Sequence, residues 1–164
     1  NGGGNVSPMI LERLSREPYR LTMRRGSARI GTVPDAVQVG PKVCLINKYS
    51  ASDGDLFPWG FRALGLGKLI GTRTWGGIVG ISGSLPYMDG TDIRVPFFTS
   101  FDPKTGSWII ENHGVDPDIL IDNDPVKEWN GEDQQLDRAI QEVMKELQDR
   151  KPLPGVPTSR DFSK

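Results

Sequence analysis

The hydrophobic pattern of residues 43–72 predicts a strand, a helix and a second strand. Residues 43–47 form a short apolar run that ends in asparagine, as in a strand that is covered on both faces. Residues 53–66 have a helical pattern, and Pro58 lies in or near the first turns, where proline is best tolerated. Residues 68–72 predict the next strand. This order favours two parallel strands joined by a crossover helix.

Helical spacing of apolar residues predicts one further helix on each side of this unit. The apolar residues from Ile10 to Leu14 indicate a short helix that ends near Arg16, with Ser7 as its N-cap. A longer amphipathic helix is predicted over residues 133–147, where apolar residues recur at helical spacing: Leu136, Ile140, Val143, Met144 and Leu147.

The other segments predict loops and antiparallel strands. Residues 17–41 carry several arginines together with glycine and proline, and we expect an exposed, irregular excursion. The run Trp75-Gly76-Gly77 predicts a tight turn with close backbone approach. Residues 78–111 are rich in β-branched and aromatic side chains between turn signals, which is typical of a β meander or hairpin. Residues 118–121 predict one more short strand.

Together these elements predict an α/β fold with a parallel βαβ unit, a β meander and a C-terminal helix. We expect one domain over residues 1–150 and a loose tail over residues 151–164, because the tail is rich in proline, serine and charge and has little apolar surface to bury.

Composition narrows the class of protein. The formal net charge of the 164 residues is -1, so nothing favours a nucleic acid or an anionic membrane as partner. A single cysteine excludes an internal disulfide and a cysteine-based zinc site. No apolar run approaches the roughly 20 residues of a membrane span. The chain starts within a glycine loop, and we expect it to be part of a larger protein, in which a targeting signal upstream would not be seen from this sequence.

Ser52 is the candidate nucleophile, because α/β enzymes place an exposed nucleophile where a buried strand turns into a helix. The backbone N–H of Asp53 would then point into the same pocket from the helix start. A second N–H would come from Gly3 or Gly4, since glycine lets backbone amides approach a ligand closely. The alternative interpretation is that Ser52 is only a helix N-cap.

The base is the missing part of this arrangement. His113 is the only histidine, and a lone histidine beside glycine is more often a loop residue than a catalyst. Glu111 follows three apolar residues and is the better catalytic candidate, with a solvated carboxylate at a strand end as its alternative. No metal or cofactor site is predicted: four aspartates near the chain's last third lack the glycine and glutamate of a calcium loop and are interpreted as solvated loop charges, namely Asp116, Asp118, Asp122 and Asp124.

With these residues in place, residues 1–147 resemble the C-terminal part of a tricorn protease. The resemblance rests on the following stretches: Asn1-Gly2-Gly3-Gly4-Asn5-Val6-Ser7, Asn47 through Asp55, Leu64 through Gly77, Glu111-Asn112, and Gly114 through Asp118. Tricorn proteases belong with the C-terminal processing peptidases, whose catalytic core resembles the ClpP/crotonase fold.

The resemblance implies a role for each candidate residue. Ser52 would be the nucleophile of a serine peptidase, and the amides of Asp53 and Gly4 would form the oxyanion hole. Glu111 would be the carboxylate of a catalytic tetrad. The histidine base and a second serine of this family lie well upstream of the glycine loop, so we expect the present chain to be inactive alone and to need the upstream part of the protein.

The resemblance also bears on substrate, assembly and location. Relatives place an acidic residue that favours basic P1 side chains where this chain has Arg20, Arg24 and Arg25 and no acid. We therefore expect acidic or apolar P1 residues if these arginines face the pocket; if the loop is displaced, they are solvated. The substrate implied is a peptide or an unfolded chain. Resemblance favours a hexameric assembly and the cytoplasm, although an extracytoplasmic location stays open.

Two functions of other classes stay open at this point. One is a crotonase-like acyl-transfer enzyme or isomerase, which would use the glycine-loop amides to hold a thioester enolate and would not need Ser52. The other is a non-catalytic scaffold that binds a peptide as an added strand beside an exposed sheet edge, and its binding would survive the loss of Ser52.

Overall fold

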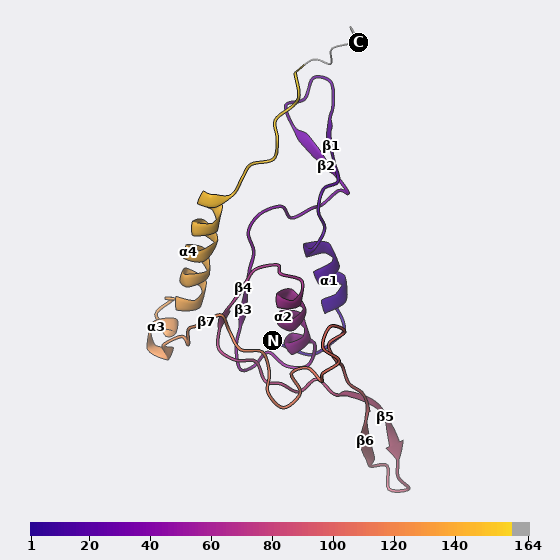
Figure 1. Cartoon of the computed structure of the whole chain (residues 1–164). Coiled ribbons are helices and arrows are strands. Elements are labelled where there is room, and N and C mark those ends of the chain that lie inside the picture. Colours follow the sequence, from indigo (N-terminus) through magenta and orange to yellow (C-terminus); the bar gives the residue numbers. More distant parts are fainter. Residues whose placement is uncertain (159–164) are drawn as a thin grey trace.

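The predicted strand–helix–strand unit lies at the centre of the computed structural model (Figure 1). Strands β3 (Val43–Ile46) and β4 (Lys68–Gly71) are parallel and are joined by helix α2 (Asp53–Ala63). Strand β7 (Ile119–Leu120) pairs in parallel with the other edge of β4, which gives the strand order β3-β4-β7. The structure describes residues 1–158, apart from the side chains of residues 82–85.

Helices cover both faces of this small sheet. Helix α1 (Ser7–Leu14) packs on α2, and α2 packs on β3 and β4, while helix α4 (Gln134–Asp149) lies on the opposite side (Figure 1). The buried core on the α2 side contains Leu11, Cys44, Ile46, Phe61, Leu69 and Val115. Burial raises the pKa of the Cys44 thiol to about 11, so this thiol is protonated at neutral pH.

Helix α1 begins differently from the prediction. Val6 is its N-cap residue, and Ser7 is the first residue of the helix rather than the cap. The Ser7 hydroxyl instead donates to a carboxylate oxygen of Asp53 at 2.5 Å. The prediction of Ser7 as N-cap is therefore wrong, because a side chain from another helix satisfies the start of α1.

Helix α4 confirms the predicted amphipathic helix, but its apolar stripe points outward. Leu136, Ile140, Met144 and Leu147 are each at least 41% exposed. The buried residues are Ala139 and Glu142, and the Glu142 carboxylate forms ion pairs with Lys68 of β4 and with Arg138. Helix α4 is attached to the sheet through the small side chain of Ala139 and the ion pairs of Glu142 rather than through a large apolar contact. The short helix α3 (Pro125–Trp129), which precedes α4, was not predicted.

Residues 17–29 are mostly exposed, as predicted, but residues 30–34 are half-buried, and the segment contains regular strands rather than an irregular excursion. Strands β1 (Arg20–Met23) and β2 (Ile30–Val33) form an antiparallel hairpin that projects from the sheet (Figure 1). Three of the four residues of β1 are exposed, so burial leaves no apolar pattern for sequence reasoning to detect. Backbone pairing holds these strands together, with Thr22 opposite Gly31.

A second hairpin confirms the prediction for residues 78–111. Strands β5 (Gly80–Pro86) and β6 (Asp92–Phe98) are antiparallel around a turn at Asp89-Gly90, and an isolated bridge joins Phe101 to Trp108. All residues of β6 are exposed, so both of its faces meet solvent. Figure 1 shows this hairpin extending from the sheet, away from the β1–β2 hairpin.

Residues 151–158 form no helix or strand, and the predicted tail beyond them falls outside the described residues. Over the part of the chain that the structure describes, no helix combines the length and apolar character needed to cross a membrane.

The attachment of α4 predicts an acid-sensitive element. The hydrogen bond from Lys68, and then the one from Arg138, lower the pKa of Glu142. A carboxyl whose pKa is lower in the folded state stabilises the fold above its unfolded pKa, and that stability is lost as the pH falls through the folded pKa. In the full-length protein we expect the hydrogen-exchange protection factors of α4 amides, corrected for the intrinsic exchange rate at each pH, to fall below about pH 4. Glu142→Gln should remove this pH dependence, whereas the exposed Asp149→Asn should retain it; equal profiles for wild type and Glu142→Gln would contradict the prediction.

Candidate active site

Ser52 lies in the turn between β3 and α2, at the carboxyl end of the parallel strands. Its backbone has φ 56° and ψ -114°, a combination that residues with a side chain rarely adopt. An N-cap serine normally has extended backbone angles and accepts a hydrogen bond from the helix start. Ser52 has neither the extended backbone angles nor the capping hydrogen bond. The geometry matches the strained strand-to-helix turn of an exposed nucleophile better than it matches a simple cap.

The glycine loop at the start of the chain packs directly on this turn. The carbonyl of Asn1 accepts a hydrogen bond from the backbone N–H of Ala51 at 3.1 Å. A Cβ atom added to Gly3 would lie 3.3 Å from the Ser52 hydroxyl oxygen, and one added to Gly54 would lie 3.1 Å from the Gly2 carbonyl oxygen. Gly4 has φ 145°, a conformation that favours glycine. Main-chain groups of the loop therefore reach the nucleophile without interference from side chains.

The carboxylate of Asp53 joins the glycine loop to α2 from the other end of the loop. Oδ2 accepts hydrogen bonds from the backbone N–H groups of Val6 at 2.9 Å and Ser7 at 3.0 Å, and Oδ1 accepts from the Ser7 hydroxyl. Asp53 is only 6% exposed. A carboxylate is favourable at a helix N-terminus, where N–H groups lack intrahelical partners. Asp53 therefore caps α1 while its own backbone forms the first turn of α2.

A loop after β4 links the Ser52 turn to the segment that carries Glu111. The N–H of Trp75 donates to the carbonyl of Ser50 at 2.9 Å. The N–H of Gly76 donates to Oδ1 of Asp55 at 2.7 Å. The carbonyl of Gly76 accepts from the N–H of Asn112 at 2.7 Å. A Cβ added to Gly76 would lie 2.4 Å from a backbone nitrogen, which confirms the predicted tight turn with close backbone approach.

Glu111 lies in a turn rather than at the end of a strand. Its Oε2 atom accepts hydrogen bonds from the backbone N–H groups of Ile78 at 2.7 Å and Val79 at 3.0 Å. The interpretation of Glu111 as a freely solvated carboxylate is therefore not supported, because two main-chain donors fix one of its oxygens. Among the groups that the structure describes, which leave out the side chains of residues 82–85, no donor bonds the other oxygen, Oε1.

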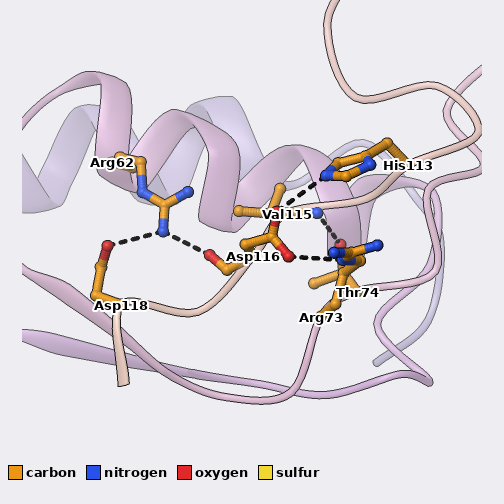
Figure 2. Close-up of polar contacts among 7 residues, drawn as sticks. All are labelled: Arg62, Arg73, Thr74, His113, Val115, Asp116 and Asp118. Atoms are coloured by element: carbon orange, nitrogen blue, oxygen red, sulfur yellow. Dashed lines mark hydrogen bonds and ion pairs between the residues drawn. The ribbon is translucent and has the colours of Figure 1, made fainter. Parts of the chain in front are cut away.

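His113 belongs to a surface network beside Arg62 of α2 rather than to the Ser52 turn. Figure 2 shows its Nε2 atom beside Oδ2 of Asp116, at 2.9 Å, and Arg73 donating to Oδ1 of the same carboxylate. The hydrogen bond from His113, followed by the one from Arg73, lowers the pKa of Asp116. Arg62 of α2 bonds the Asp116 carbonyl and the Asp118 carboxylate (Figure 2). The network fastens the chain before β7 to α2 and to the loop after β4.

Three of the four aspartates predicted to be solvated loop charges make specific contacts instead, whereas Asp122 is an exposed loop residue, as predicted. Asp116 and Asp118 pair with arginines, and Oδ2 of Asp118 also accepts from the N–H of Leu69 at 2.7 Å. Asp124 caps α3 by accepting from the N–H groups of Val126 and Lys127. Among the residues whose positions are described, no group of three or more histidine, cysteine or acidic side chains is arranged to hold a metal ion.

Arg20, Arg24 and Arg25 lie in or just after β1 of the projecting hairpin. Figure 1 shows this hairpin on the far side of α1 from the chain start, which packs on the Ser52 turn. The structure therefore brings Ser52, Asp53, Gly4 and Glu111 to one end of the sheet and leaves the three arginines elsewhere in the same chain.

Sequence reasoning missed two side-chain roles in this region. The sequence pattern indicates a role for the backbone N–H of Asp53 but none for its carboxylate. Asp55 was not selected at all, although it is fully buried and its Oδ2 atom has no hydrogen-bond partner among the described residues. Both residues occur as acids in the first turn of a helix, a position that is equally common in exposed helices, so the sequence contained no signal that they are buried.

Comparisons with known proteins identify the family of the chain. Residues 1–121 match Peptidase family S41. The chain belongs to peptidase family S41, a family of serine-type peptidases. It is 43% identical to the tricorn protease of Thermoplasma volcanium and 42% identical to that of Thermoplasma acidophilum, over 90% of this chain and 14% of each relative. A crystal structure of the tricorn protease superposes with a TM-score of 0.81 at 40% identity, over 90% of this chain and 14% of that chain.

These similarities confirm the predicted α/β fold and the tricorn-type peptidase family. They do not favour a crotonase-like acyl-transfer enzyme or a non-catalytic scaffold. The chain spans 14% of the length of the tricorn proteases named above.

Proposed function

We propose that the protein to which this chain belongs is a tricorn-type serine peptidase that hydrolyses peptides or unfolded chains with Ser52 as nucleophile. The observation that carries the proposal is the backbone of Ser52, which has positive φ and no capping hydrogen bond. Strain of this kind costs about 1–3 kcal/mol and persists where the surrounding structure enforces it, typically at functional sites. A structural cap would need no such strain.

The oxyanion hole would be formed by main-chain N–H groups on either side of Ser52. The N–H of Asp53 follows the nucleophile at the start of α2, where the helix dipole adds a positive field. The second N–H would be that of Gly4, in the loop whose neighbour Gly3 packs against the Ser52 side chain. When Ser52 Oγ attacks a peptide carbonyl, the carbonyl oxygen becomes an oxyanion that these two donors stabilise.

Glu111 would be the orienting carboxylate of the active site. Its Oε2 atom is held by Ile78 and Val79, so Oε1 can accept a hydrogen bond from a further catalytic group. We propose that the upstream part of the same protein supplies this group together with the histidine base. The base takes the proton of Ser52 and passes it to the leaving amine. Because His113 is engaged with Asp116, the isolated chain 1–164 is expected not to hydrolyse peptides.

The partners proposed are a peptide substrate, the upstream part of the protein and further copies of it. The family resemblance supports a homo-oligomer, and specifically a hexamer, as the proposed assembly. No cofactor is needed, since nucleophile, orienting carboxylate and oxyanion donors are all protein groups.

Replacement of Ser52 tests the nucleophile. In the full-length enzyme, Ser52→Ala should abolish both peptide hydrolysis and labelling by a fluorophosphonate. It should change the free energy of unfolding by less than about 0.5 kcal/mol, because no capping hydrogen bond is lost. Ser107→Ala, at an exposed serine, is the matched control. Activity of Ser52→Ala within tenfold of wild type would exclude Ser52 as the nucleophile.

Replacement of Glu111 tests the orienting carboxylate. Glu111→Gln keeps the shape of the side chain and removes its charge, and we expect kcat to fall by about 10²–10⁴ with little change in KM. Glu128→Gln, at an exposed carboxylate of α3, should leave kcat unchanged. An unchanged kcat in Glu111→Gln would reduce the role of Glu111 to fixing the backbone of residues 78–79.

Substrate profiling distinguishes the two alternatives for Arg20, Arg24 and Arg25, which are exposed and lie away from Ser52 in this chain: contact with the P1 side chain in the full-length protein, or solvation. If these arginines contact the P1 side chain, a substrate lysine or arginine is costly to bury beside them, so a fluorogenic peptide library should show acidic or apolar P1 residues and no selection of basic ones. A preference for acidic P1 residues should weaken with added salt. The double variant Arg24→Glu/Arg25→Glu should raise the relative kcat/KM for basic P1 residues. Clear selection of Arg or Lys by the wild type would refute the proposed role of these arginines.

A further inference from the structure

The Asp53 side chain connects the start of α2 to the start of α1. Asp53 is 47 positions from Val6 and 46 positions from Ser7 in the sequence. Its carboxylate accepts three hydrogen bonds, from the N–H of Val6, the N–H of Ser7 and the Ser7 hydroxyl. Asp53 and Ser7 are both buried. The backbone of Asp53 is fixed in turn within the first turn of α2, directly after Ser52. One residue therefore holds the start of α1 at a set distance from the start of α2.

We propose that the Asp53 carboxylate is a positioning group that sets the separation between the two N–H donors of the oxyanion hole. This inference rests on the proposed function. One donor is the N–H of Asp53 itself, and the other is the N–H of Gly4, which is separated from Val6 by a single residue. The side chain and the backbone of the same residue thus act on opposite walls of the site.

The glycine loop needs such a fastening because it has little of its own. Three consecutive glycines carry no side chain to pack and lose more conformational entropy on ordering than other residues do. On the upstream side the loop is held at Asn1, whose carbonyl accepts from Ala51 and whose Oδ1 accepts from the Ser50 hydroxyl at 3.3 Å. On the downstream side it is held through Val6 and Ser7 by Asp53. Loss of the second fastening leaves Gly4 free to move relative to Ser52.

Small displacements of this kind matter for the chemistry. Oxyanion donors act when they lie about 2.7–3.1 Å from the position that the charged oxygen occupies in the transition state. Removal of one donor costs about 10²–10³ in kcat, and misplacement by 1 Å costs about 10²-fold. Binding of the uncharged substrate depends much less on these donors. A positioning role therefore predicts a loss in kcat and in affinity for transition-state analogues, with KM nearly unchanged.

The hydrogen-bond pattern of Asp53 provides a graded set of variants. Asp53→Asn retains the pattern, because the amide oxygen can accept from both N–H groups and the amide nitrogen can donate to the Ser7 hydroxyl. Asp53→Ala removes all three bonds, and Asp53→Ser leaves a polar group that is too short to span them. Ser7→Ala removes one bond of the three. Ser15→Ala, at the other end of α1, is the matched control.

The experiment uses the full-length peptidase. Active sites are counted by fluorophosphonate labelling carried to completion, and kcat per labelled site, KM and the inhibition constant of a peptide aldehyde are measured. Ser52 Oγ adds to the aldehyde carbon and forms a hemiacetal whose oxygen occupies the oxyanion hole. We expect Asp53→Ala to lower kcat per site by about 10²-fold and to weaken aldehyde inhibition by a similar factor, with KM within threefold of wild type. Asp53→Asn should lose less than tenfold in kcat and Ser7→Ala less than fivefold, and Ser15→Ala should match wild type.

Counting by labelled site separates positioning from folding, because a misfolded fraction lowers the number of sites without changing their inhibition constant. If Asp53→Ala does not fold, Asp53→Ser should show the same loss per site. Unchanged kcat and aldehyde inhibition in the variants without the three bonds would overturn the inference. It would equally be overturned if Asp53→Asn were as impaired as Asp53→Ala. Failure of the proposed function appears separately, as a wild-type enzyme that is not labelled at Ser52.

Discussion

The hydrogen bonds between the Asp53 carboxylate and the first N–H groups of α1 are the interaction on which the rest of the site depends. Helix α1 has no side-chain cap from its own sequence, so its starting amides would otherwise be buried without partners. The acceptor comes from the first residue of α2, which follows Ser52. Helix capping, a local matter in most proteins, here joins two helices and the glycine loop between Asn1 and α1.

The loop after β4 extends this arrangement to Glu111. It bonds the Ser52 turn through Ser50 and Asp55, and it bonds the Glu111 turn through Gly76, Ile78 and Val79. Asp55 is fully buried, and among the described residues no group donates to its Oδ2 atom. The loop needs an acceptor for the N–H of Gly76, and Asp55 is the acceptor that the start of α2 provides.

Sequence patterns predicted the parallel unit from its buried apolar runs, the second hairpin from β-branched and aromatic residues between turn signals, and α4 from the helical period of its apolar residues. The β1–β2 hairpin left no such period, since backbone pairing rather than side-chain burial holds it. At the site, the residue types around Ser52 and Glu111 predicted where reactive groups would lie. The buried contacts of Asp53 and Asp55 depend on segments more than 20 positions away, and a local pattern contains no record of such pairings. The outward direction of the apolar stripe of α4 depends in the same way on Lys68, a distant residue of β4.

The β5–β6 hairpin has a consequence for a protein with this proposed activity. Every residue of β6 is exposed, and its strand is extended with aromatic side chains such as Phe97 and Phe98 in solvent. Peptidases bind extended segments, and exposed loop tips such as the turn at Asp89-Gly90 are preferred sites of proteolytic nicking. The hairpin therefore has the features of a substrate within the enzyme itself. A segment or partner that covered this hairpin in the full-length protein would protect the peptidase against autolysis and would also shield apolar surface from water.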